Sequence, residues 1–114
     1  MNHITWIEIS KSALTKNIQQ FRKIVGDKIL CPCVKANAYG HGLVEAGKIF
    51  VEAGADWLSV NSLYEAAKLR AAAVNVPIYI LGYVVLENLA EAVDLDCRIV
   101  VYNRETIEEL GRLG

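Results

Sequence analysis

Cysteine, proline and long apolar runs are scarce in this sequence of 114 residues. Its three cysteines make neither a disulfide framework nor a zinc quartet, and Cys31 and Cys33 are expected to be small buried side chains in a reducing compartment. No apolar stretch reaches the length of a membrane span, and residues 1–5 lack the pattern of a signal peptide. The expectation is a cytoplasmic protein with no membrane partner.

Charge of one sign is lacking as well, because the formal net charge at pH 7 is -1 and both signs are mixed along the chain. This argues against a nucleic-acid partner and against a polybasic membrane patch. No GxGxxG or P-loop follows any predicted strand, so a nucleotide-binding fold has no support. What remains is a chain with 54% hydrophobic residues, enough to bury the core of one small domain.

Strand-like and helix-like segments alternate along this chain. Strands are predicted, from β-branched, aromatic and other apolar runs, at residues 4–9, 29–34, 57–60, 78–81 and 98–102. Helices are predicted, from apolar residues at helical spacing, at residues 11–25, 43–53, 63–73, 86–93 and 104–113. Ser10 and Gly26 are suited to begin and end the first helix. A new strand roughly every 20–28 residues predicts a parallel α/β fold.

The stretch VKANAYGHG, residues 34–42, follows the second predicted strand. It places Lys35 at the carboxyl end of that strand, where α/β folds carry their active groups. A lysine among apolar neighbours can act as an amine nucleophile, which suggests Schiff-base chemistry; a solvated lysine at a strand end is the simpler interpretation. Gly40 and Gly42 allow backbone conformations closed to other residues, so a ligand can come close.

This stretch resembles the cofactor-lysine signature of alanine racemases, which are fold-type III pyridoxal-phosphate enzymes with a TIM-barrel N-terminal domain. Other segments occur in the order that the family shows, namely WIEI at 6–9 followed by AL at 13–14, AGAD at 53–56 and IYILG at 78–82. The resemblance covers essentially the whole chain. It implies the N-terminal half of a (β/α)8 barrel, with a leading strand in residues 1–9 and a partial barrel of parallel strands and helices in residues 10–114.

The resemblance also implies roles for single residues. Lys35 would hold pyridoxal 5'-phosphate as a Schiff base and act as general acid and base on one face of the substrate. Tyr39 would bind the cofactor phosphate and Leu81 would contact the cofactor, with simple packing as the alternative for each. His41 is expected to stabilise the loop through a hydrogen bond rather than to bind phosphate. No metal site is expected.

The activity implied is interconversion of L- and D-alanine for cell-wall precursor supply. In the family the enzyme is a homodimer, and the opposite face of the substrate is served by a tyrosine of the partner's C-terminal domain, which no residue here matches. A related pyridoxal-phosphate barrel enzyme, either an amino-acid decarboxylase or a broad-specificity racemase, remains an alternative. So do a non-catalytic pyridoxal-phosphate-binding protein and, less favoured, a lysine aldolase without cofactor.

A closed barrel of this type needs about 250 residues. The chain is therefore expected to be an N-terminal portion, without the rest of the barrel or the C-terminal β domain. Two open sheet edges should make these residues alone poorly soluble or cause them to pair with another copy. Racemase activity is not expected from them alone.

Overall fold

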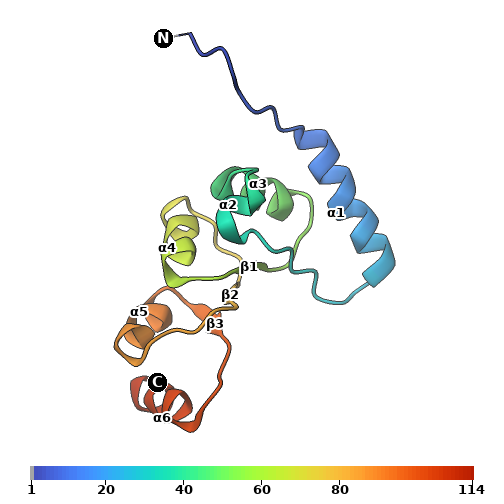
Figure 1. Ribbon diagram of the computed structural model, residues 1–114. Helices are drawn as coiled ribbons and strands as arrows, with labels where there is room; N and C mark the ends of the chain where they lie inside the picture. The colour runs from blue at the N-terminus through green and yellow to red at the C-terminus, as the bar shows by residue number, and fades with distance from the viewer. Residues whose placement is uncertain (1) are drawn as a thin grey trace.

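The computed structural model describes residues 2–114. Its elements, in chain order, are α1 (Lys11–Val25), α2 (Lys35–Tyr39), α3 (Leu43–Glu52), β1 (Leu58–Val60), α4 (Leu63–Ala71), β2 (Ile78–Ile80), the 3-10 helix η1 (Leu86–Asn88), α5 (Leu89–Asp94), β3 (Cys97–Ile99) and α6 (Arg104–Leu113). The three strands form one parallel sheet in the order β1-β2-β3 (Figure 1). The predicted parallel α/β fold is therefore confirmed.

A fourth chain segment, residues 30–34, runs beside β1 at the edge of the sheet. Val34 N–H donates to Ser59 O (2.8 Å), and Ser59 N–H donates to Pro32 O (3.0 Å). The predicted strand at 29–34 is nevertheless reduced to one bridge, between Cys33 and Ser59. Pro32 has no N–H to donate, and no segment of residues 2–114 pairs with the other side of this stretch.

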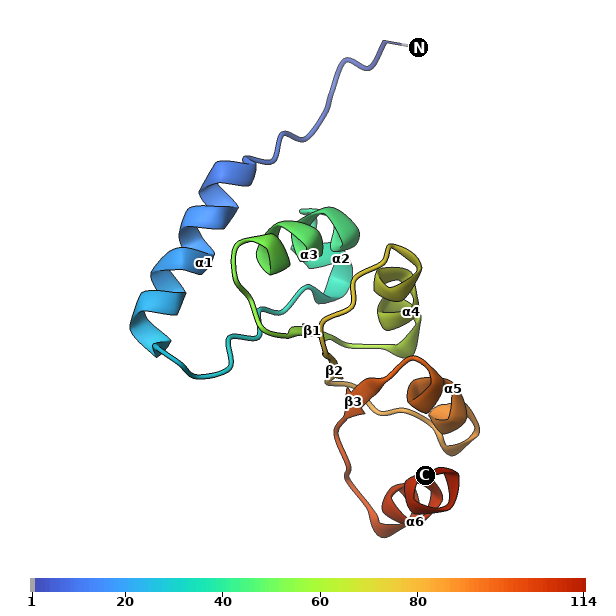
Figure 2. The same ribbon diagram turned by 180° about the vertical axis from the view of Figure 1, so that it is seen from behind.

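The two faces of the sheet differ in what covers them. One face is packed under the helices, and its side chains are fully buried at Val34, Leu58, Val60, Ile78 and Ile80. On the other face the paired positions Cys33, Ser59, Tyr79 and Arg98 form a row across the sheet. Figures 1 and 2 both show the helices in an arc on one side of the strands, with no described element covering the other side.

The amino-terminal segment corrects one prediction. Residues 2–9 form no strand, and the side chains of Ile4 and Trp6 are 97% and 68% exposed. This segment extends away from the body of the domain (Figure 2). A β-branched and aromatic sequence favours a strand only where a neighbouring strand satisfies its backbone groups, and residues 2–114 provide none here. Residue 1 of the predicted leading strand lies outside the described residues.

The helix ends follow the local sequence closely. Ser10 accepts a hydrogen bond from Ala13 N–H at the start of α1, and Gly26 ends it with a positive φ of 64°, both as predicted. The predicted helix 86–93 is divided into η1 and α5, and the last predicted strand begins one residue earlier and is shorter.

Among residues 2–114 no helix combines the length and apolar character required to cross a membrane.

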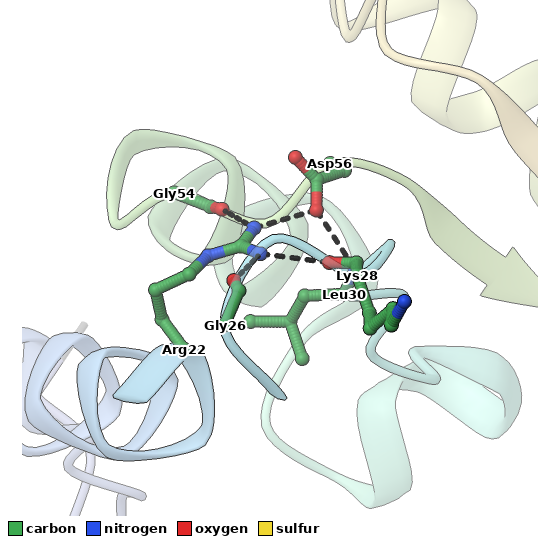
Figure 3. Close-up of polar contacts among 6 residues, drawn as sticks. All are labelled: Arg22, Gly26, Lys28, Leu30, Gly54 and Asp56. Carbon is green, nitrogen blue, oxygen red and sulfur yellow. Dashed lines mark hydrogen bonds and ion pairs between the residues drawn. The ribbon is translucent and has the colours of Figure 1, made fainter. Parts of the chain in front are cut away.

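Arg22, in the last turn of α1, joins two loops at the amino-terminal end of the sheet (Figure 3). Its guanidinium donates to the carbonyl oxygens of Gly26 (3.1 Å), Lys28 (2.8 Å) and Gly54 (2.8 Å) and to the carboxylate of Asp56 (2.5 Å). The same Asp56 oxygen accepts from Leu30 N–H at 2.7 Å. These contacts attach α1 and the 26–30 loop to the segment that enters β1.

Arg70, near the end of α4, makes the same kind of attachment two strand–helix units further along. It donates to the carbonyl oxygens four and six residues ahead, Val74 (2.7 Å) and Val76 (2.8 Å), as Arg22 does with Gly26 and Lys28. It also donates to Leu95 O (2.8 Å) and Asp96 O (3.1 Å), before β3. Five donors in a fixed planar geometry make arginine suited to joining several loop carbonyls.

We expect Arg22→Ala to lower the free energy of unfolding by about 1–3 kcal/mol, because four acceptors lose a charged donor that is only partly solvated. Lys11→Ala is the matched control, since the Lys11–Glu52 ion pair is 66% and 61% exposed and should contribute less than about 1 kcal/mol. Urea unfolding followed by circular dichroism measures both. Equal midpoints for the two variants would contradict the assigned role of Arg22.

The same cluster predicts a pH dependence. The hydrogen bond from Arg22, followed by the one from Leu30 N–H, lowers the pKa of Asp56 below its ordinary value. A lowered folded-state pKa contributes stability above the unfolded pKa of about 3.9, and that stability is lost as the pH falls through the folded pKa. The stability difference between the wild-type chain and Asp56→Asn should therefore be largest near neutral pH and shrink below about pH 4. A constant difference from pH 3 to pH 7 would contradict it.

Both edges of the sheet are open within residues 2–114, at segment 30–34 and at β3. We therefore expect the 114-residue chain alone to associate with further copies, because unpaired edge groups pair readily with another chain. Analytical ultracentrifugation across a concentration series measures this. A monomer that unfolds cooperatively in denaturant would contradict the expectation.

Candidate functional site

Lys35 lies where the segment beside β1 ends and α2 begins. It is half-buried, and it follows Val34, which is fully buried against the helices. The pairing of β1 with β2 continues past the strands, since Leu81 N–H donates to Val60 O (2.8 Å) and Gly82 N–H to Asn61 O (3.0 Å). The carboxyl ends of three neighbouring segments therefore meet at one edge of the sheet, as the sequence predicted for Lys35.

The backbone directly after Lys35 turns in the left-handed sense. Ala36, Asn37, Ala38 and Tyr39 all have positive φ angles, between 52° and 57°. Left-handed helical geometry costs roughly 1–2 kcal/mol for each residue with a Cβ and is ordinarily limited to single residues. A run of four is therefore held by its surroundings, and such strained backbone concentrates at functional sites. Sequence reasoning missed this feature, since alanine and tyrosine do not indicate it.

Hydrogen bonds within the loop hold part of this left-handed turn. Ala38 N–H donates to Val34 O (2.8 Å), and Gly42 N–H donates to Asn37 O (2.9 Å). The Asn37 side-chain oxygen accepts from Leu43 N–H (2.9 Å), the first amide of α3. This amide at a helix start therefore already has an acceptor, the side chain of Asn37.

His41 contributes to the same loop. Its ring nitrogen Nδ1 lies 3.0 Å from Ala38 O, at hydrogen-bond distance. The prediction that His41 stabilises the loop through a hydrogen bond is therefore confirmed. Gly40 and Gly42, on either side of it, have φ angles of 96° and 93°, which only glycine adopts readily.

A further contact comes from α4, through Glu65. Its Oε2 atom accepts from Ala36 N–H at 2.8 Å, and its Oε1 atom accepts from Asn61 N–H, Ser62 N–H and the Ser62 hydroxyl. Ser62 in turn accepts from Glu65 N–H, which completes a capping box. Sequence reasoning assigned no contact to Glu65. The Ser-x-x-Glu spacing at 62–65 was the available signal.

Tyr39 and Cys33 lie together beside Lys35. The Tyr39 hydroxyl is 3.6 Å from Cys33 Sγ, and the tyrosine is 62% exposed. Burial raises the pKa of the Cys33 thiol, but the Lys35 backbone N–H, the Tyr39 and Ser59 hydroxyls and the Lys35 charge outweigh it, so this pKa is lowered. The contact with Cys33 raises the pKa of Tyr39. Cys33 is thus in contact with polar groups rather than simply buried.

Leu81 directly follows β2 and is half-buried. Its carbonyl oxygen accepts from the Tyr102 hydroxyl at 2.9 Å, so the end of β2 is tied to the chain beyond β3. A Cβ on the next residue, Gly82, would lie 2.3 Å from Asn61 O, so only glycine fits there. Lys35, Tyr39 and Leu81 accordingly share the carboxyl edge, and Tyr102 is a further polar group that sequence reasoning had treated only as the end of a strand.

The described residues contain no group of side chains arranged to bind a metal ion. Within residues 2–114, no three histidine, cysteine, aspartate or glutamate side chains approach one another closely enough to hold a metal ion. The cysteines Cys31, Cys33 and Cys97 are all free thiols. The carboxyl edge carries an amine, hydroxyls and a thiol, and the His41 imidazole and the Glu65 carboxylate bond to the loop backbone.

Comparison with known proteins assigns the family. A family model described as the N-terminal domain of alanine racemase matches residues 9–114. The chain belongs to this family. It is 40% identical over 115 residues to the alanine racemase of Methanococcus maripaludis and 40% identical over 109 residues to alanine racemase 1 of Bacillus subtilis. These alignments cover 100% and 95% of this chain, but 31% and 28% of the relatives.

Solved alanine racemase structures have the same fold. The structure from Bacillus anthracis with bound L-Ala-P matches 99% of this chain with a TM-score of 0.89 and 32% identity, and the one from Oenococcus oeni matches 93% with a TM-score of 0.84 and 34% identity. The chain spans 30% and 29% of those two proteins. This alanine racemase N-terminal domain is thus the first part of a (β/α)8 barrel, as predicted; the boundary proposed at residues 9 and 10 stays a prediction.

In the left-handed turn, replacing alanine by glycine should stabilise the domain, whereas the same replacement in a right-handed helix destabilises it. We expect Ala36→Gly to raise the free energy of unfolding by about 1 kcal/mol, because glycine adopts a φ of 52° without a Cβ clash. Ala13→Gly, at an exposed position in the right-handed helix α1, should lower it by about 0.5–1 kcal/mol. Thermal and urea unfolding of both variants measure this. Destabilisation of similar size in both would contradict a strained turn at residue 36.

Proposed function

We propose that this domain is the N-terminal part of a pyridoxal-phosphate-dependent amino-acid racemase that interconverts L- and D-alanine and supplies cell-wall precursors. The proposal rests on one observation above all, that Lys35 stands at the carboxyl edge of a parallel sheet directly before a strained backbone turn, in a chain that belongs to the alanine racemase family. Strain of this kind is maintained where a side chain must be held in place for function.

The residues present fit the cofactor that this activity requires. Lys35 supplies an amine for the aldehyde of pyridoxal 5'-phosphate, and the Tyr39 hydroxyl supplies a donor for a phosphate oxygen. The long 3.6 Å contact with Cys33 and the 62% exposure leave the Tyr39 hydroxyl available to a ligand. Leu81, half-buried at the same edge, supplies apolar contact. The domain would hold one side of the cofactor.

The chemistry divides between cofactor and protein. Pyridoxal phosphate, when bound, withdraws electrons from the amino acid so that the proton on Cα can be removed near neutral pH. Lys35 removes or returns that proton on one face of the substrate as general acid and base. Tyr39 would orient the cofactor by its phosphate, and the hydrogen bonds around residues 36–42 hold the backbone between Lys35 and Tyr39.

The partners and location follow from the same proposal. The substrate is L- or D-alanine, and the full-length enzyme is a homodimer in which the second chain contributes to the opposite face. Cytoplasmic location is part of the proposal and is supported by three free cysteines, which a reducing compartment maintains. A related decarboxylase or racemase of wider specificity would use Lys35 in the same way and differ in the groups that face the substrate.

We expect the 114-residue chain, mixed with pyridoxal 5'-phosphate and reduced with borohydride, to carry the cofactor mass on Lys35. Peptide mass spectrometry measures the site. Lys48→Arg, which changes an exposed lysine on α3, should leave labelling intact, and Lys35→Arg should abolish it at this site. No D-alanine should form from L-alanine in the isolated chain. Labelling spread evenly over the exposed lysines would contradict the assignment of Lys35, and turnover by these residues alone would contradict the need for the rest of the enzyme.

A further inference from the structure

Glu65 satisfies two separate sets of donors with its two carboxylate oxygens. Oε1 completes the capping box of α4, with acceptor distances of 2.9, 3.0 and 3.1 Å to Asn61 N–H, Ser62 N–H and the Ser62 hydroxyl. Oε2 lies 2.8 Å from the amide nitrogen of Ala36, which is 29 residues away in the sequence. A capping box requires the first set only. The second contact therefore needs a separate explanation.

The Ala36 amide belongs to the peptide bond that leaves Lys35. It stands at the start of the left-handed turn, where φ of Ala36 is 52°, and the first N–H groups of any helical turn have no partner within that turn. The next hydrogen bond in the loop, from Ala38 N–H to Val34 O, begins only two residues later. The hydrogen bond to Glu65 satisfies the N–H of the Lys35–Ala36 peptide plane from a residue outside the loop.

We propose that Glu65 is a positioning residue for Lys35, which holds the peptide bond after the lysine so that the lysine side chain leaves the sheet toward Tyr39 and Cys33. This inference rests on the proposed function, because it concerns the lysine that would carry the cofactor. Glu65 does not touch the cofactor; it acts through the backbone of Lys35. The Glu65 carboxylate thus links the start of α4 to the backbone that sets the direction of the Lys35 side chain.

The chain offers variants that separate the two roles of Glu65. Glu65→Gln keeps one carbonyl oxygen, which the three donors of the cap will take, and turns an NH2 group toward Ala36 N–H, so that two donors face each other. Ser62→Ala is the matched control, since it removes the cap hydroxyl and leaves the acceptor for Ala36 N–H in place. Glu65→Ala removes both contacts. It is included because the glutamine amide of Glu65→Gln could flip, which would turn its oxygen toward Ala36 N–H and keep that hydrogen bond.

The test follows the rate at which pyridoxal 5'-phosphate becomes attached to Lys35 in the full 114-residue chain, by absorbance and by borohydride trapping with mass spectrometry. Urea unfolding of each variant gives its stability in parallel. We expect Glu65→Gln and Glu65→Ala to slow attachment about ten-fold or more, because misplacement of a reacting group costs rate steeply, while Ser62→Ala attaches cofactor at the wild-type rate. Hydrogen exchange of the Ala36 amide should rise in the two Glu65 variants alone.

The outcomes are distinguishable. Wild-type attachment rates in both Glu65 variants would overturn the positioning role while leaving the proposed function intact. Equal slowing in Ser62→Ala and Glu65→Gln would also overturn it, since a loss of the cap alone would then explain the effect. If the wild-type chain attaches no cofactor at Lys35, the proposed function itself fails, and this role fails with it.

Discussion

The left-handed turn after Lys35 is the constraint on which the candidate site depends. Its four residues each carry a Cβ, so their intrinsic preference opposes the conformation that they adopt. The turn donates hydrogen bonds to Val34 O and to Glu65 on α4 and accepts one from Leu43 N–H of α3, and these bonds supply what the residue preferences do not. The direction of Lys35 is therefore a property of the packed domain, and a loosened contact with α3 or α4 would change it.

The two ends of the sheet are stabilised in different ways. At the amino-terminal end, Arg22 and Arg70 each join carbonyl oxygens four and six residues ahead to a loop before a later strand, and positive φ at residues with a Cβ is limited there to single positions, Ala73 and Asp96. At the carboxyl end, the chain keeps a strained turn, an exposed tyrosine and a thiol of lowered pKa. Parallel α/β folds commonly divide stability and chemistry between the two ends in this manner.

The features that sequence reasoning predicted correctly have local causes. Ser10 and Gly26 bound α1 because a serine oxygen and a glycine φ act within one turn of the chain. The failures concern groups whose partners lie elsewhere. Residues 4–9 have the composition of a strand but no neighbour to pair with among residues 2–114, and the run at 29–34 contains Pro32 at an edge that is open within the same residues. Strand formation depends on a second segment, which composition does not describe.

By itself, the sequence determined the alternation of the three paired strands with helices, the two ends of α1 and the placement of Lys35 where a strand segment stops, since each follows from periodicity or from a capping residue. Only the tertiary structure decided the handedness of the turn at 36–39, the contact of Glu65 with the Ala36 amide and the attachment of Arg22 to Asp56. The physical reason is range: propensities act over a few residues, whereas these hydrogen bonds join groups 29 and 34 residues apart.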